Sequence, residues 1–196
     1  YLGLKLNGGF FQNQKRFGLP NIQGIIVLCD GEDGSPLAIM ESVQITINRT
    51  GATTAVAAKY LAKPDSKTVT ICGCGTQGRV QLKSLIEVLP IERVFVVDAD
   101  REKAGAFAIE MAEELQVEAV TVDSIGECLE TSDVLVTCTP STSPLIEPEN
   151  IPDGLFIAAV GADSPEKQEL DVRILAQAKV VVDLIDQCKN VGELHH

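Results

Sequence analysis

The stretch Thr68-Val-Thr-Ile-Cys-Gly-Cys-Gly-Thr-Gln-Gly78 decides how this chain is expected to fold. Apolar and β-branched residues lead into the pattern Gly73-x-Gly75-x-x-Gly78, and apolar residues at helical spacing follow at once. Strand, glycine turn and helix in this order predict a dinucleotide-binding unit. Gly73 is expected to form the turn, Gly75 to let the backbone approach a pyrophosphate, and Gly78 to let the helix pack closely on the strand. Open N–H groups at the helix start would face the phosphate charge.

A second predicted strand, residues 93–98, ends in a carboxylate 20 residues after Gly78. An acid at the position of Asp98 can accept hydrogen bonds from the adenosine ribose hydroxyls. Such an acid repels the 2′-phosphate of NADP, and the nearest following cation is Arg101, so the sequence favours NAD over NADP. A glycine-rich turn that binds nothing is the alternative, and the strand, helix, spacing and acid together disfavour it.

Composition narrows the class of protein. The chain has 196 residues, of which 45% are hydrophobic and 22% charged, as in ordinary globular proteins. A net charge of −12 argues against nucleic acid as a partner, because a phosphate backbone needs a basic face. No apolar run is long enough for a membrane helix. Six cysteines without C-x-x-C spacing, and histidines only at His195 and His196, predict no metal site and fit a reducing, cytoplasmic compartment.

From residue 68 onward, predicted strands and helices alternate, which is typical of a Rossmann-type doubly wound α/β fold with a parallel sheet. The predicted strands are 68–72, 93–98, 117–122, 133–137, 155–160 and 179–183, and the later helices are 101–115 with Asp100 as N-cap, 124–130 and 170–178.

The first part of the chain does not follow this alternation. Residues 10–16 are predicted as a loop, 22–28 and 37–40 as a hairpin, and a helix is expected after residues 49–52 and up to Ala62. Residues 1–50 are therefore predicted as a separate α+β segment, 51–190 as the nucleotide-binding domain, and 191–196 as the start of a further segment.

Two loops follow the fourth and fifth predicted strands, on the side where a nicotinamide would lie. The first contains Thr137-Cys-Thr-Pro-Ser141, and the second runs from Gly161 to Glu169. Asp163 in the second loop would take a proton from a substrate amine, or else would serve as a helix N-cap or turn residue. Lys5 and Arg49 are cations suited to a carboxylate, and Arg49 equally to a pyrophosphate; the alternative for both is a solvated surface position.

Several runs along the whole chain resemble the ornithine cyclodeaminase/mu-crystallin family. They are Gly3-Leu-Lys5, Thr46-Ile-Asn-Arg-Thr-Gly-Ala52, Ala57-Ala-Lys-Tyr-Leu-Ala62, Gly73-Cys-Gly-Thr-Gln77, Thr137-Cys-Thr-Pro-Ser141, Val160-Gly-Ala-Asp163 and Lys167-Gln-Glu-Leu170. The second, third and fourth runs look most like the archaeal-type alanine dehydrogenases of this family. The resemblance implies a Rossmann domain and a substrate and dimerisation domain built from both chain ends, of which residues 1–50 would be an incomplete part. The chain is expected to start after the family's first segment and to stop before its last.

The resemblance also implies roles for individual residues. Lys5 would hold the substrate carboxylate, with Arg49 as a second substrate contact, and Asp163 would be the acid/base. The cofactor site would be lined by Arg49, Thr50, Gly73, Gly75, Thr76, Gln77, Gly78, Asp98, Cys138, Thr139, Val160, Gly161 and Lys167.

The implied reaction is transfer of a hydride from the Cα of a small L-amino acid to NAD, giving an imine, with release of ammonia. Attack by the substrate's distal amine would convert ornithine to proline, whereas attack by water would give a 2-oxo acid, as in an alanine dehydrogenase. A ketimine reductase and an NAD(P)-binding protein without turnover are the alternatives. Asp163 weighs against the reductase, because mu-crystallin-like members carry a neutral residue there. A homodimer is the expected assembly.

Overall fold

A computed structural model describes residues 1–10, 12–149 and 151–196. The chain divides into two units, Tyr1–Thr50 and Gly51–His196. In the part of the chain that is described, no helix is both long and apolar enough to cross a membrane.

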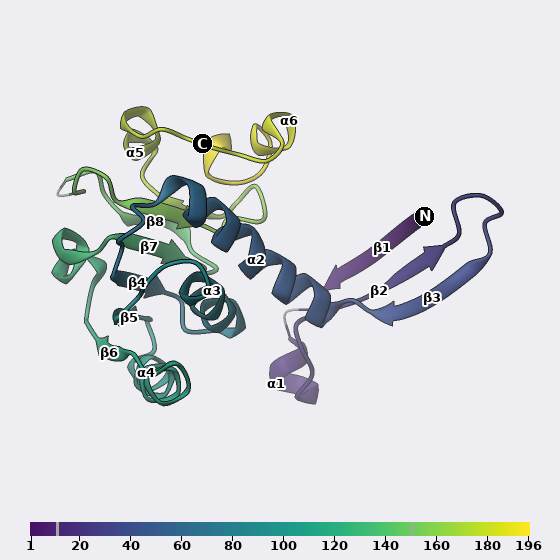
Figure 1. The fold of residues 1–196 in the computed structure, drawn as a ribbon, viewed down its shortest axis with the longest axis horizontal. Helices are drawn as coiled ribbons and strands as arrows, with labels where there is room; N and C mark the ends of the chain where they lie inside the picture. The colour runs from purple at the N-terminus through teal and green to yellow at the C-terminus, as the bar shows by residue number, and fades with distance from the viewer. Residues whose placement is uncertain (11, 150) are drawn as a thin grey trace. The chain divides into compact units, whose positions relative to one another are not determined.

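The larger unit is built on a five-stranded parallel sheet with the order β6-β5-β4-β7-β9 (Figure 1). Its strands are β4 Thr68–Cys72, β5 Arg93–Val97, β6 Glu118–Thr121, β7 Val134–Thr137 and β9 Phe156–Ala159. The glycine-turn strand β4 is central, and the strand order reverses on either side of it, which is where such sheets bind ligands. The predicted Rossmann-type fold is confirmed.

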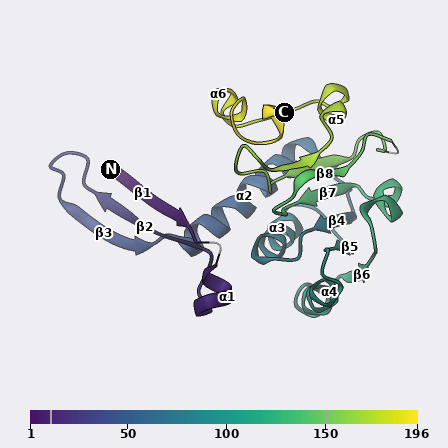
Figure 2. The ribbon, with the colours of Figure 1, turned by 180° about the vertical axis from the view of Figure 1, so that it is seen from behind.

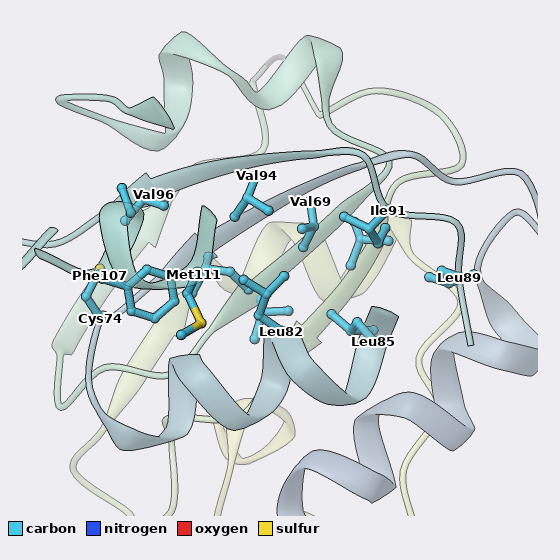
Figure 3. Packing of buried hydrophobic residues seen from close by; sticks show 14 of the residues in the cluster. Val69, Cys74, Leu82, Leu85, Leu89, Ile91, Val94, Val96, Phe107 and Met111 are labelled. Atoms are coloured by element: carbon cyan, nitrogen blue, oxygen red, sulfur yellow. The ribbon is translucent and has the colours of Figure 1, made fainter. Parts of the chain in front are cut away.

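Side chains alternate between the two faces of this sheet, as the period of a strand requires. Val69 and Ile71 of β4 face the first core cluster, whereas Cys72 faces the second. The first cluster is covered by α3 Thr76–Ile86 and α4 Arg101–Leu115, and Figure 2 shows both helices on one side of the sheet. Leucines of α3 and the aromatic and thioether side chains of α4 interdigitate with the valines of the strands (Figure 3). Phe107 and Met111 are fully buried, and each such side chain contributes about 1.5–3 kcal/mol to stability.

The second face is covered by short elements, in part not predicted. The expected helix 124–130 is a pair of 3₁₀ turns, η1 Ile125–Glu127 and η2 Leu129–Thr131. The two strands β8 Thr142–Ile146 and β10 Gln168–Leu170 pair in parallel as a separate small sheet. Because Leu170 belongs to β10, the helix expected at 170–178 begins later, as α5 Val172–Gln177 capped by Asp171.

The predicted sixth strand at residues 179–183 is wrong. The segment has no strand pairing within the described residues, and Val180 and Val181 are exposed. Three consecutive valines suggested a buried strand, but the sheet ends at β9, and α6 Ile185–Cys188 and η3 Glu193–His195 follow instead.

The smaller unit contains an antiparallel sheet of β1 Leu2–Gly9, β2 Ile22–Cys29 and β3 Pro36–Glu41. The β2–β3 hairpin agrees with the sequence prediction, whereas β1 was not predicted. The loop expected at 10–16 contains the helix α1 Asn13–Phe17, and Phe11 lies outside the described residues. The long helix α2 Val43–Leu61 begins earlier than predicted, so Arg49 and Thr50 lie inside it rather than before it.

Candidate dinucleotide site

The three glycines of the turn after β4 have different surroundings. Gly73 has φ +106°, and a Cβ there would lie 2.8 Å from the carbonyl oxygen of Cys138. A Cβ on Gly78 would lie 2.2 Å from the oxygen of Gly73, so the helix could not start so close to the strand. A Cβ on Gly75 would meet no described atom within 4 Å. The chain's own packing therefore requires glycine at two positions and leaves open space at the third, where a ligand would approach.

The first turn of α3 has the features of an anion-binding site. Its N-cap is Gly75, which offers no side chain to the first N–H groups of this eleven-residue helix. The Oε1 atom of Gln77, on the first turn, is buried without a hydrogen-bond partner among the described residues. Unpaired N–H groups and the positive end of the helix dipole favour a phosphate group at this position.

Arg79 supports the turn, and sequence reasoning missed it. Its Nη1 donates to the carbonyl oxygens of Cys74 at 2.7 Å and Gly75 at 3.2 Å, while its Nε and Nη2 donate to Glu110 of α4. These bonds fix the direction in which the turn presents its backbone. The only sequence signal was a cation one residue after the glycine pattern, which is a common surface residue.

Asp98, at the carboxyl end of β5, is tied to the glycine turn. Its Oδ2 accepts from the backbone N–H of Cys74 at 2.8 Å, and its Oδ1 accepts from that of Asp100 at 3.0 Å. Lys103 lies 3.8 Å from Oδ2, whereas Arg101 pairs with Asp123 at 2.9 Å. The carboxylate retains acceptor capacity on both oxygens, since each can take a further bond. Asp98 thus lies beside the turn, as an adenosine ribose would need.

Two cysteines lie beside the turn. Burial raises the pKa of Cys74 to about 12 and also raises the pKa of Cys138 above its ordinary value. The Sγ of Cys138 donates to the carbonyl oxygens of Cys72 and Gly73 at 3.4 and 3.2 Å. A neutral thiol therefore joins the loop after β7 to the glycine turn, and this contact is structural in kind.

A buried carboxylate joins the loops after β7 and β9. The Oε1 of Glu169 accepts from the backbone N–H and the hydroxyl of Thr139 at 2.7 and 2.8 Å. Its Oε2 accepts from the N–H of Gly161 at 2.8 Å. Val160, just before Gly161, donates its N–H to the carbonyl of Thr137 at 2.8 Å and so extends the pairing of the two strands. Sequence reasoning quoted Glu169 only as part of a matching run and gave it no role.

Asp163 and Lys167 are brought together in the loop after β9. The Nζ of Lys167 lies 2.5 Å from Oδ1 of Asp163, and the Asp163 side chain is 71% exposed. No helix begins at Asp163, so the N-cap alternative does not apply, whereas the turn alternative stands: its N–H donates to the carbonyl of Gly161 at 3.0 Å, and a turn closed by Lys167 and Ser164 follows before β10. An exposed carboxylate paired with a cation, two residues beyond Gly161, is accessible to a substrate.

Lys5, Arg49 and Thr50 belong to the smaller unit. Lys5 lies on β1 opposite Ile26 and is exposed. Arg49 and Thr50 lie in α2, where the Thr50 hydroxyl donates to the carbonyl of Thr46 at 2.8 Å. Their roles remain predictions. The described residues contain no cluster of three or more side chains that could hold a metal ion.

These features define a class of protein. A parallel sheet with a glycine turn on its central strand, an open helix start and an acid beside it is the arrangement of Rossmann-type dinucleotide-binding proteins. The family model of the ornithine cyclodeaminase/mu-crystallin family matches residues 1–196, and the chain belongs to this family.

Three similar proteins illustrate the family. Alanine dehydrogenase from Archaeoglobus fulgidus is 42% identical over 197 residues, covering 100% of this chain and 59% of the relative. An archaeal alanine dehydrogenase dimer with bound NAD has a TM-score of 0.90 and 39% identity, covering 98% of this chain and 59% of that one. Delta(1)-pyrroline-2-carboxylate reductase from Thermococcus litoralis, in complex with NADH and L-proline, has a TM-score of 0.91 and 38% identity, covering 97% and 58%. The chain thus spans about three-fifths of the length of these relatives.

Proposed function

We propose that the whole protein is an NAD-dependent enzyme that oxidises the Cα-amine of a small L-amino acid to an imine and releases ammonia. The observation that carries this proposal is the shared sheet edge. The glycine turn, Asp98 and the Asp163–Lys167 pair all follow carboxyl ends of parallel strands. The similarity to alanine dehydrogenases supports the reaction class.

The chain's residues fit NAD, which would accept the hydride from the substrate. The amides of Thr76 and Gln77 would bind the diphosphate above the open space at Gly75. Asp98 would accept from the adenosine ribose, which favours NAD over NADP. Thr139 and Gly161 would line the nicotinamide half, together with Cys138, Val160 and Lys167.

Asp163 would act as the base. It would take the proton from the substrate ammonium, because only a neutral amine has a lone pair to drive the hydride from Cα. Lys167, whose Nζ lies 2.5 Å from the Asp163 carboxylate, would hold that carboxylate in position beside the substrate. Lys5 would pair with the substrate carboxylate, and Arg49 would bind the cofactor or that same carboxylate.

The fate of the imine separates the products. Attack by a distal amine of the substrate gives cyclodeamination, and attack by water gives a 2-oxo acid. A second candidate is imine reduction, favoured by the likeness to the reductase from Thermococcus litoralis. A homodimer is proposed from the dimeric alanine dehydrogenase. A reducing, cytoplasmic compartment is proposed from six cysteines that are all free thiols.

The test incubates the intact protein and NAD with L-alanine, L-ornithine or L-lysine. Net NADH formation identifies a dehydrogenase, and proline with ammonia without net NADH identifies a cyclodeaminase. Consumption of NADH with pyrroline-2-carboxylate identifies a reductase. Asp163→Asn should lower kcat by about 10²- to 10⁴-fold and spare NAD binding.

The matched control is Glu166→Gln, which removes an exposed carboxylate from the same loop and should leave kcat unchanged. Equal turnover by Asp163→Asn and the native protein would remove Asp163 from the mechanism.

A further inference from the structure

Glu169 is a buried carboxylate, and burial of a carboxylate carries a large desolvation cost. Its exposed fraction is 0%, and it lies in β10, which pairs with β8. Removing an ionised carboxylate from water costs several kcal/mol unless hydrogen bonds replace the lost water. Both Glu169 oxygens accept such bonds, from Thr139 on one side and Gly161 on the other. All three groups donate to Glu169, so both of its oxygens serve as acceptors.

The loops after β7 and β9 pack closely against the carboxylate of Glu169. A Cβ on Gly161 would lie 2.4 Å from the carbonyl oxygen of Thr139 and 2.5 Å from Cδ and Oε1 of Glu169. Only a residue without a side chain brings its N–H this close to the carboxylate. The N–H of Thr139 and the N–H of Gly161 therefore converge on one side chain, and that side chain sets the separation of the loops.

Glu169 is itself held in place by a second carboxylate. The Oε1 and Oε2 of Glu193, in η3, accept from the backbone N–H groups of Glu169 at 2.8 Å and Leu170 at 3.1 Å. His196 Nε2 lies 2.8 Å from the carbonyl oxygen of Lys167 in the same loop. The backbone that carries Glu169 is thus fixed by contacts from the C-terminal residues Glu193 and His196.

We propose that Glu169 is a positioning residue for the nicotinamide half of the site. It acts through Thr139 and Gly161, which it holds at one spacing, and it does not touch the reacting atoms. The adenine half has its own internal hydrogen bond, from the Cys74 N–H to Asp98, and meets the loop after β7 only through the packing and thiol contacts of Cys138 and Thr139 with the glycine turn, so it should depend less on Glu169. This inference rests on the proposed dinucleotide function.

The first test needs no variant. In the intact protein without ligand, hydrogen exchange is followed by NMR or mass spectrometry at the amides of Thr139 and Gly161. Both amides follow the end of a strand and donate to a buried anion, so they should exchange at least about tenfold more slowly than unprotected amides, as amides hydrogen-bonded to charged groups do. Exchange at the unprotected rate would overturn the proposal.

The second test compares NAD⁺ with ADP-ribose, which lacks the nicotinamide. Glu169→Gln keeps the shape of the side chain but presents an NH₂ group to a backbone donor. It should weaken NAD⁺ binding by about tenfold or more and change ADP-ribose binding by less than about twofold. The matched control Glu166→Gln should change neither.

The outcomes separate the two proposals. If the native protein binds neither NAD⁺ nor ADP-ribose, the proposed function fails. If it binds both and Glu169→Gln weakens both equally or neither, the positioning role fails. Should Glu169→Gln not fold, Thr139→Val and Thr139→Ser replace it. Only the first removes the hydroxyl donor to Glu169, so only the first should weaken NAD⁺ relative to ADP-ribose, and equal behaviour of the pair would overturn the proposal.

Discussion

The two halves of the candidate site are held by different physical means. The adenine half is shaped by backbone sterics, with Gly73, Gly75 and Gly78 within one short turn, and its distant partners include Asp98 and Cys138. The nicotinamide half is shaped by one buried charge, Glu169, which gathers loops that follow different strands. The adenine half therefore depends mainly on residues that are neighbours in the sequence, and the nicotinamide half depends on contacts between residues that are far apart in the sequence. Substitutions that add volume should damage the first, and substitutions that remove charge should damage the second.

The largest effect is expected when a side chain is added to the glycine turn. In Gly78→Ala the Cβ would lie 2.2 Å from a backbone oxygen, so α3 must move away from β4. We expect the free energy of unfolding to fall by about 3 kcal/mol, in line with other overpacked cores, and NAD⁺ binding to weaken about 100-fold. Chemical denaturation and calorimetric titration measure the two quantities.

Gly75→Ala sharpens the contrast. Gly75 has φ −82° and open space around a Cβ, so the free energy of unfolding should stay within about 0.5 kcal/mol of the native value. NAD⁺ binding should nevertheless weaken about tenfold, because the methyl group would occupy the approach of the diphosphate. If Gly75→Ala bound NAD⁺ with native affinity, the diphosphate would not lie at this turn.

A smaller effect is expected for the acid of the adenine half. Asp98→Ala removes the acceptor for the Cys74 N–H and the proposed ribose contact. NAD⁺ binding should weaken about tenfold, while NADP⁺ binding should weaken less, so that the preference between them narrows. The control is Asp100→Ala, which removes the N-cap of α4 at a cost of about 1 kcal/mol in stability and should leave the preference for NAD⁺ intact. An unchanged preference in Asp98→Ala would exclude Asp98 as the ribose acceptor.

The smallest expected effect is the pH dependence of the stability contributed by Glu193, which holds the backbone of Glu169. Burial raises the pKa of Glu193 above its usual 4.5. Its contribution to stability is therefore fully present below the pKa of the unfolded chain and is lost as pH rises through the higher folded pKa. The free energy of unfolding of the native protein, relative to Glu193→Gln, should fall as pH rises from the usual pKa of a glutamate through the raised pKa of Glu193.

The contribution of Glu166 to stability should depend on pH in the opposite direction. A hydrogen bond from its own backbone N–H holds the pKa of this exposed carboxyl below its usual value, so its contribution is present at higher pH and lost as pH falls. The two differences in the free energy of unfolding, native protein minus Glu193→Gln and native protein minus Glu166→Gln, should therefore change in opposite directions with pH. A change in the same direction would contradict the account of Glu193.

Sequence predicted the adenine half better than the nicotinamide half for the same physical reason. The glycine spacing, the strand before it and the acid after the next strand are local patterns, and the structure places them together. Arg79 and Glu169 lacked such a signal, because their partners are set by the packing of distant elements. The false sixth strand at 179–183 shows the converse: consecutive valines predict a strand, but only an available neighbour in the sheet makes one.

The central claim is that a dinucleotide lies across the carboxyl edge of the parallel sheet. The most direct measurement is the set of backbone amide chemical shifts of the intact protein as NAD⁺ is added. The account predicts perturbations at residues 73–78, 98, 138–139 and 160–161. The contrary result is a response confined to the opposite edge of the sheet, at the shallow cavity lined by Lys67, Thr68, Glu92, Arg93 and Glu118.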